Sequence, residues 1–226
     1  MTDSGSVPVG ATPVIDHARL ALACAYAVAA HAGQTRKGTV IAYASHLLGV
    51  GAHVLEHGGT TEQAIAGLLH DVVEDQGGVP RLHEVCAVFG EVVAQLVDAV
   101  SDAAPNDGQE KAPWLERKQQ YLDHLGELVA ADSPAVLVSA CDWFHNLTAI
   151  GHDLDDPNVG TAVFERFNGP DIDATVFNHR SVVEVFTGAP DVLVPSRLKR
   201  QLIGALARVE AGANEWHAKQ QTKAGR

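Results

Sequence analysis

The sequence has few cysteines, and their positions do not suit a disulfide framework. Only three occur in 226 residues, Cys24, Cys86 and Cys141, and each stands in an apolar stretch. An odd number of widely spaced cysteines without a C-x-x-C pair is typical of reduced thiols in a protein core. The sequence therefore predicts a cytoplasmic protein without disulfides.

Basic residues are also in short supply. The chain has 16 Lys and Arg against 28 Asp and Glu, which gives a formal net charge of -12. A surface with this charge repels a phosphate backbone, so we expect no nucleic-acid partner. An anionic small molecule could still bind where a metal ion or a local basic cluster offsets the repulsion.

No apolar run has the length or the flanks of a membrane segment. The most apolar stretch is LALACAYAVAA at residues 20–30. It begins 19 residues from the N-terminus, and residues 1–18 contain no Lys or Arg. A signal peptide needs a basic region ahead of its apolar core, and a spanning helix needs more apolar residues. We expect a buried helix here and no contact with a membrane.

Alternating strand patterns and internal repeats are missing too, whereas helical periodicity is present along most of the chain. Thr60 and Gln63 form a capping-box pattern that predicts a helix start at about Thr61. The predicted helical segments are 14–31, 43–57, 61–75, 80–88, 91–101, 113–130, 133–151, 174–186 and 196–216. The fold class is therefore all-α.

Composition does not change along the chain, which favours one domain. We predict this domain at 13–218, with a core at about 20–150 and C-terminal helices at about 160–218. A flexible N-terminal arm at 1–12 and a flexible tail at 219–226 complete the chain.

A cluster of polar residues follows the apolar residues of the third predicted helix, in LLHDVVEDQG at 68–77. Helix positions four apart share a face, so Glu74 should lie one turn beyond His70, and Asp75 one turn beyond Asp71. A neutral imidazole and a carboxylate suit a divalent cation, but two ligands hold such an ion poorly. The cluster therefore predicts a metal site with further ligands from elsewhere.

Two residues are candidates for these further ligands: His46, which follows a glycine-containing loop, and Asp142, which ends an apolar segment. With His70 and Asp71 they supply two nitrogens, two oxygens and a charge of -2. Such a set neutralises a divalent ion and leaves positions for water and substrate, which is typical of a hydrolytic site.

Five motifs occur along the chain in the order RKGTVIAYASH, LLHDVVED, FGEVVAQLV, LERK and DWFHN. This set resembles the HD-domain metal-dependent phosphohydrolases, and most of all the small stand-alone alarmone hydrolases of the RelA/SpoT type. The resemblance covers about residues 20–150 and implies an HD-domain helical bundle.

The resemblance implies one Mn²⁺ ion held by His46, His70, Asp71 and Asp142. It also implies that Glu74 and Asp75 handle the attacking water, and that the reaction releases pyrophosphate from the 3′ position of (p)ppGpp or (p)ppApp. Mixed His and carboxylate sites accept several divalent metals, although zinc is less expected without cysteine ligands.

The resemblance further suggests which side chains meet the substrate. The larger enzymes usually have Pro after the first His and Arg after the last Asp, where this chain has Leu47 and Trp143. Phe177 and Asn178 are weaker candidates for the same pocket. The suggested substrate contacts are Arg36, Lys37, Arg117, Lys118, Asn146 and Arg180.

Two alternatives stay open at this point. The same metal site could act on another nucleotide phosphoester, or the chain could be a sensor that binds a nucleotide without turnover. A pure binder would not need the acidic pair Glu74 and Asp75, which favours the enzyme. We expect a small-molecule nucleotide as partner and consider a homo-oligomer possible, and we interpret His31 and His145 as hydrogen-bonding or packing residues.

Overall fold

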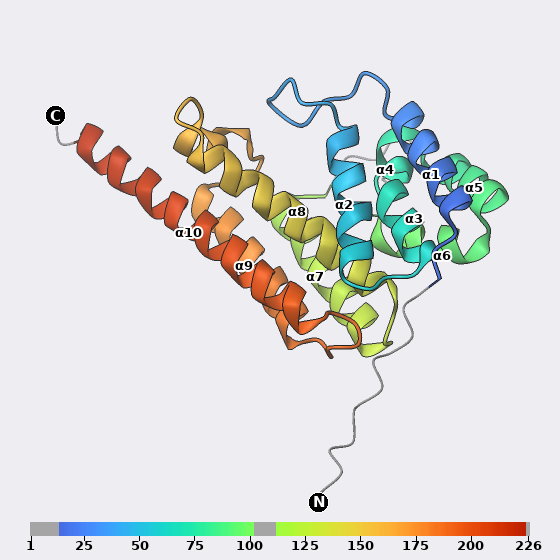
Figure 1. The fold of residues 1–226 in the computed structure, drawn as a ribbon. Helices are drawn as coiled ribbons and strands as arrows, with labels where there is room; N and C mark the ends of the chain where they lie inside the picture. Colours follow the sequence, from blue (N-terminus) through green and yellow to red (C-terminus); the bar gives the residue numbers. More distant parts are fainter. Residues whose placement is uncertain (1–13, 102–111, 225–226) are drawn as a thin grey trace, which may run out of the picture.

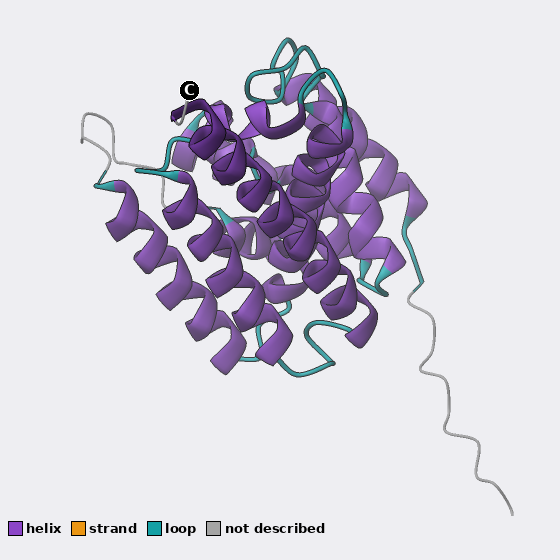
Figure 2. Cartoon of the chain, turned by 90° about the vertical axis from the view of Figure 1, so that its left-hand side faces the viewer, coloured by secondary structure: helices purple, strands orange, loops and turns teal. Residues whose placement is uncertain are grey.

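The computed structural model describes residues 14–101 and 112–224, and this part of the chain consists of helices and connecting loops, without strands (Figure 2). The all-α prediction is confirmed. The predicted N-terminal arm lies outside the described residues. The helices are α1 (His17–Ala30), α2 (Ala44–Glu56), α3 (Thr61–Leu69), α4 (Val72–Gln76), α5 (Gly78–Phe89), α6 (Glu91–Val100), α7 (Trp114–Ala130), α8 (Ala135–Asp155), the 3₁₀ helix η1 (Gly160–Arg166), α9 (Ile172–Gly188) and α10 (Ser196–Ala224).

Helix α8 is the central element of the bundle. It contacts α2, α3 and α6 of the N-terminal half as well as α10 and η1 of the C-terminal half, and Figure 1 shows it between α2 and α10. Every residue from Ala135 to Cys141 is buried. A helix start that is apolar on all sides can only be accommodated inside the protein, so the sequence of α8 fixes its place.

Helix α3 is the corresponding buried element of the N-terminal half, packed between α1, α2 and α6. Its start is the predicted capping box, in which Thr60 Oγ1 accepts from the Gln63 backbone and the Thr60 N–H donates to Gln63 Oε1. All residues of the helix from Thr61 to Leu69 are buried except two. The cap thus sets where α3 begins, and the burial of α3 fixes the direction of the last residues of this helix.

The structure corrects the prediction of one continuous helix at 61–75. Helix α3 ends at Leu69 and α4 begins at Val72, so His70 and Asp71 lie at a break between two helices. The backbone of Asp71 has φ -90° and ψ -5°, outside regular helix geometry. Ser101 Oγ donates to the His70 carbonyl at this break. Asp71 is the N-cap of α4, and the Asp75 backbone N–H donates to the Asp71 carbonyl at 2.9 Å, so Asp71 and Asp75 still lie one helical turn apart.

Helix α10 extends further than predicted. It continues to Ala224, so residues 219–224 are helical where the sequence predicted a tail. Contacts with other elements accompany this extension, since Lys219 Nζ donates to Thr161 Oγ1 and His217 pairs with Asp173 at 2.8 Å. The remaining domain boundaries stay predictions.

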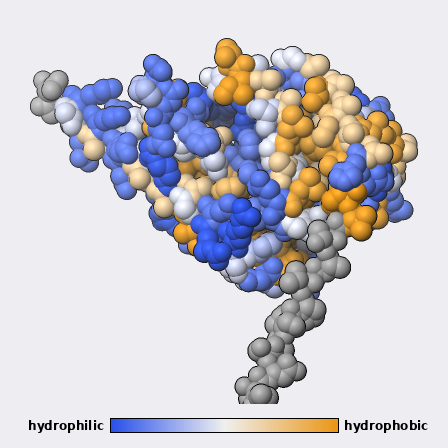
Figure 3. All heavy atoms as spheres, in the orientation of Figure 1, coloured by the Kyte–Doolittle hydropathy of each residue, from blue (hydrophilic) through white to orange (hydrophobic). Residues whose placement is uncertain are grey.

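The surface differs between the two halves of the bundle. Hydrophilic side chains prevail over α9 and α10, and apolar ones are more frequent over the half that contains α1, α5 and α6 (Figure 3). No helix among the described residues combines the length and the apolar character needed to cross a membrane. The exposed apolar side chains of α1, α5 and α6 include Leu22, Val28, Val79, Val88 and Val92. Helix α1 is therefore not the buried helix that the sequence predicted at residues 20–30: only Ala23 and Ala27 of α1 are buried.

Candidate metal centre

The four predicted metal ligands converge on one point, although they come from three places in the chain. His46 lies on α2, His70 and Asp71 lie at the α3–α4 break, and Asp142 lies on α8. His70 Nε2 is 3.1 Å from His46 Nε2 and 3.0 Å from Asp71 Oδ2. His46 Nε2 is 3.2 Å from Asp142 Oδ1. The two remaining His–Asp distances are both 3.5 Å.

These separations fit a shared divalent ion. Ligand bonds of about 2.1 Å place neighbouring ligand atoms about 3.0 Å apart in octahedral geometry and about 3.4 Å apart in tetrahedral geometry. The ligand atoms of His46, His70 and Asp142 all lie within 4.8 Å of one another. Two imidazole nitrogens that face each other at hydrogen-bond distance, with two carboxylates beside them, form a donor set that suits a cation.

Neighbouring groups orient three of the four ligands. His70 Nδ1 lies 2.8 Å from the Gly67 carbonyl, to which it donates, so Nε2 keeps its lone pair. The Tyr43 hydroxyl donates to Asp71 Oδ2 at 2.6 Å, and Asn146 Nδ2 donates to Asp142 Oδ1 at 2.7 Å. Each of these three ligands is thus held by a hydrogen bond as well as by its backbone.

The electrostatics of the cluster favour ionised carboxylates. Burial alone would raise the pKa of Asp142, but the adjacent imidazoles of His46 and His70 outweigh it and hold the pKa below its ordinary value. The pKa of Asp71 is lowered in the same way, against burial, by the adjacent imidazoles of His70 and His46. Burial lowers the pKa of His145, behind His46, to about 3, so this ring stays neutral.

A cavity of about 260 Å³ opens beside the four ligands. His70, Asp71 and Asp142 form part of its wall, and the further polar lining includes three of the predicted site residues. These three are Glu74, Lys118 and Asn146. The cavity therefore brings a carboxylate, an ammonium group and an amide to the candidate metal centre.

Arg36 reaches the same site through hydrogen bonds. Its Nη2 donates to Asn146 Oδ1 at 2.8 Å, and Asn146 in turn donates to Asp142. The guanidinium also lies over the Tyr43 ring, 5.8 Å from its centroid. A cation from the loop before α2 is therefore two hydrogen bonds away from a metal ligand.

The two members of the acidic pair have different surroundings. Glu74 lines the cavity, whereas Asp75 is exposed and accepts from Gln34 Nε2 at 2.7 Å. Gln34 is also bonded to Gln76, so Asp75 belongs to a polar network that ties α4 to the loop of Arg36. The geometry favours Glu74 for a contact with a reacting water.

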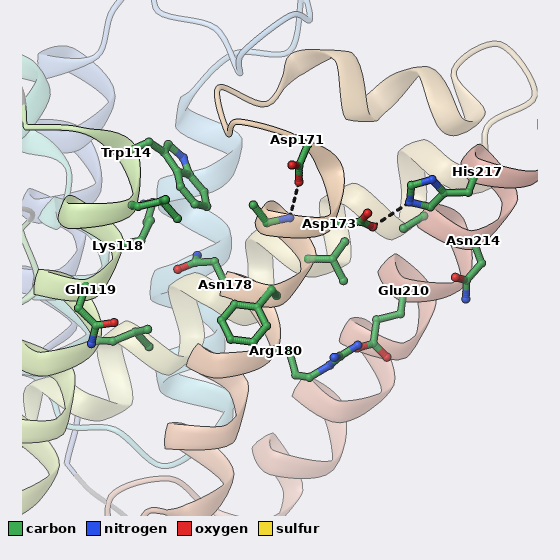
Figure 4. A pocket seen from close by; sticks show the side chains of 16 residues that line it. Trp114, Lys118, Gln119, Asp171, Asp173, Asn178, Arg180, Glu210, Asn214 and His217 are labelled. Atoms are coloured by element: carbon green, nitrogen blue, oxygen red, sulfur yellow. Dashed lines mark hydrogen bonds and ion pairs between the residues drawn. The ribbon is translucent and has the colours of Figure 1, made fainter. Parts of the chain in front are cut away.

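The remaining predicted substrate contacts are not brought to the 260 Å³ cavity. Lys37 is exposed, and Arg117 Nε donates to the Ala112 carbonyl near the start of α7. Arg180 forms an ion pair with Glu210 and lines a second cavity of about 640 Å³ between α7, α9 and α10 (Figure 4). Lys118 lines both cavities and therefore marks their common border.

The sequence interpretation missed Tyr43, which contacts Asp71, and gave His145 a hydrogen-bonding or packing role without naming its partner, His46. Tyr43 stands three positions before His46, and His145 stands three positions after Asp142 on α8. The second spacing is helical and could have suggested a shared face. A tyrosine or histidine in an apolar segment otherwise has no feature that separates a ligand-orienting role from packing.

Comparisons with known proteins identify the family of this chain. The HD domain family model matches residues 23–164. The bifunctional (p)ppGpp synthase/hydrolase SpoT of Escherichia coli K12 is 31% identical over 132 residues, which is 56% of this chain and 18% of that protein. A guanosine-3′,5′-bis(diphosphate) 3′-pyrophosphohydrolase of Spiroplasma citri is 32% identical over 127 residues, 56% of this chain and 16% of the relative. The chain thus spans less than a fifth of these curated relatives.

A solved structure supports the fold assignment. It is described as a metazoan ortholog of SpoT that hydrolyzes ppGpp, and it matches with a TM-score of 0.62 and 23% identity, over 86% of this chain and 97% of the other. HD-domain hydrolases depend on divalent metals, and the His and Asp cluster of this chain could hold such an ion. Since the family model covers more than half of the sequence, the chain belongs to the HD-domain family.

Proposed function

We propose that the chain is a metal-dependent pyrophosphohydrolase that removes the 3′-diphosphate of an alarmone of the (p)ppGpp or (p)ppApp type. The observation that carries this proposal is the convergence of His46, His70, Asp71 and Asp142 beside a cavity lined by Glu74, Lys118 and Asn146. The HD-domain relatives that are named as ppGpp 3′-pyrophosphohydrolases support this choice of substrate.

The four converging residues would hold the metal, which we propose to be Mn²⁺. When bound, the ion supplies Lewis acidity at the scissile phosphate. A zinc site with thiolate ligands is not favoured. Cys141, the cysteine next to Asp142 in the sequence, is buried, and burial raises the pKa of its thiol. A protonated thiol is a poor metal ligand.

Glu74 is the proposed proton acceptor for the attacking water. The water oxygen forms a bond to the phosphorus attached to the 3′ oxygen, the bond from that phosphorus to the 3′ oxygen breaks, and pyrophosphate leaves. Glu74 takes one proton from the water, and the 3′ oxygen of the leaving nucleotide takes up one proton from the solvent. We assign to Asp75 a supporting role, since it fixes Gln34 and through it the loop that carries Arg36.

Arg36 and Lys118 are the proposed phosphate contacts. In a chain with a net charge of -12, such local cations offset the repulsion of a nucleotide polyphosphate. Asn146 connects Arg36 to Asp142, so a phosphate that contacts Arg36 would lie next to the metal centre.

The rest of the nucleotide would lie toward the second cavity, because 260 Å³ is at the lower limit for a small-molecule site. In Figure 4, Trp114 and Lys118 on α7 face Asn178 on α9 across this space. Phe177 is 66% exposed and offers an aromatic ring for stacking with a base. Arg180 stands at the other side of the cavity in its ion pair with Glu210.

A cytoplasmic location and a homo-oligomer stay predictions.

The test is product analysis with purified protein and either ppGpp or ppApp, with added Mn²⁺ or with a chelator. We expect pyrophosphate release only with the metal, and no release by Asp71→Asn. Asp98→Asn is the matched control, since it makes the same change at an exposed acid of α6 outside both cavities, and it should retain the activity. Tight nucleotide binding without turnover would instead favour the sensor, and turnover of other nucleotides alone would contradict the alarmone assignment.

A further inference from the structure

His145 is a partly buried histidine that packs on a metal-ligand candidate. Its Nδ1 lies 3.0 Å from Nδ1 of His46, with ring centroids 4.9 Å apart. The contact joins α8 to α2 across 99 positions of the chain. Because Asp142 lies on the same helix three positions earlier, α8 carries both a ligand and a neighbour of a second ligand.

The direction of this hydrogen bond decides whether His46 can bind a metal. Of two facing Nδ1 atoms, one must carry the proton and the other the lone pair. A neutral imidazole has a single N–H, so His46 offers a lone pair at Nε2 only if its proton is on Nδ1. In that tautomer His46 donates and His145 accepts. By accepting the Nδ1 proton, His145 can hold His46 in the tautomer whose Nε2 lone pair faces His70 and Asp142.

Gly49 provides the space that this contact requires. A β-carbon at Gly49 would lie 2.3 Å from both Cδ2 and Nε2 of His145, far inside van der Waals contact. Gly49 is an interior residue of α2, where alanine would be the better helix former. The His145 ring therefore lies directly against the α2 backbone, one turn away from His46.

We propose that His145 is a positioning residue for the metal centre, which accepts the Nδ1 proton of His46 and is seated by Gly49. This inference rests on the proposed metal site and adds a residue that does not itself touch the ion or the substrate. Groups that orient a metal-binding histidine in this way change metal affinity by about 10 to 100-fold when they are removed.

The test measures Mn²⁺ affinity directly, from the electron paramagnetic resonance signal of the free ion during titration of the purified protein. His145→Leu removes the acceptor, and His145→Asn keeps an acceptor oxygen near the position of Nδ1. Gly49→Ala displaces the ring without changing it. Gly204→Ala is the matched control, because Gly204 is an interior residue of α10 at which an added β-carbon meets nothing within 4 Å.

We expect His145→Leu and Gly49→Ala to weaken Mn²⁺ binding at least 10-fold, His145→Asn to stay within about 3-fold of the wild type, and Gly204→Ala to have no effect. Wild-type affinity in folded His145→Leu would overturn the proposal, as would an equal loss in His145→Asn. Should circular dichroism show that His145→Leu does not fold, Gly49→Ala and His145→Asn decide in the same way. Absence of Mn²⁺ binding by the wild type would instead contradict the metal site itself.

Discussion

Acid should destabilise this protein through His179, a histidine of α9 outside the metal centre. The ring is buried between Trp143 and Phe167, with centroid distances of 5.5 and 6.0 Å. Its Nδ1 has no hydrogen-bond partner in the part of the chain that the structure describes. Burial, with a smaller contribution from the charge of Lys118, lowers the pKa from 6.5 to about 4. The folded protein therefore keeps this ring neutral at a pH where the unfolded chain protonates it.

The sign and size of the effect follow from this difference in pKa. Between pH 6.5 and 4 the unfolded state binds more protons than the folded state, so stability falls as the pH falls. From pH 7.5 to pH 5.0, one histidine with these two pKa values lowers the free energy of unfolding by about 2 kcal/mol. This is a substantial part of the about 5–15 kcal/mol that stabilises a typical domain.

The assay is urea unfolding followed by circular dichroism at pH 7.5 and 5.0. His179→Phe keeps an aromatic ring between Trp143 and Phe167 and should lose about 2 kcal/mol less than the wild type between the two pH values. His83→Phe, at an exposed histidine of α5, is the matched control and should behave as the wild type. Equal losses in the wild type and in His179→Phe would refute this explanation.

Three further predictions concern single side chains. Tyr43→Phe removes the hydroxyl that donates to Asp71 while the ring can still stack on His31, so Mn²⁺ affinity measured by titration should fall about 10-fold; an unchanged affinity would contradict the orienting role. Lys118→Ala removes the cation shared by both cavities and should raise KM for the nucleotide about 10-fold or more in steady-state assays, with thermal stability kept; a loss of kcat alone would argue against a binding role. Thr60→Ala removes the cap of α3 and should lower the free energy of unfolding by about 1 kcal/mol in urea titrations, whereas Thr60→Ser should retain it.

The sequence allowed the fold class and most of the metal centre to be predicted, because these depend on local patterns. Helix periodicity and the Thr60 cap are local, and His70 with Asp71 stand together in a motif. His46 and Asp142 could be added because each is a possible metal ligand at the edge of an apolar segment: His46 follows a glycine-containing loop, and Asp142 ends an apolar run. The structure brings all four together at distances of 3.0–3.5 Å, as the motif order suggested.

Features that depend on tertiary contacts could not be predicted. The α3–α4 break lies in a sequence whose helical periodicity continues, and only the structure shows Ser101 bonded to the His70 carbonyl. The ion pair of Arg180 with Glu210 joins residues 30 positions apart, and the contact of His145 with His46 spans 99. Such pairs leave no regular spacing in a single sequence.

The origin of the metal centre in α2, α8 and the α3–α4 break also has a consequence for the lifetime of the protein. The four ligands lie close together only when these elements are packed, so the folded chain binds the ion and the unfolded chain does not. By mass action, a ligand at 100 times its Kd adds about 2.7 kcal/mol to the free energy of unfolding. A shortage of the metal would then remove the activity and also increase the fraction of unfolded chain that proteases can cleave. The cell's supply of the ion would therefore set the amount of this protein together with its activity.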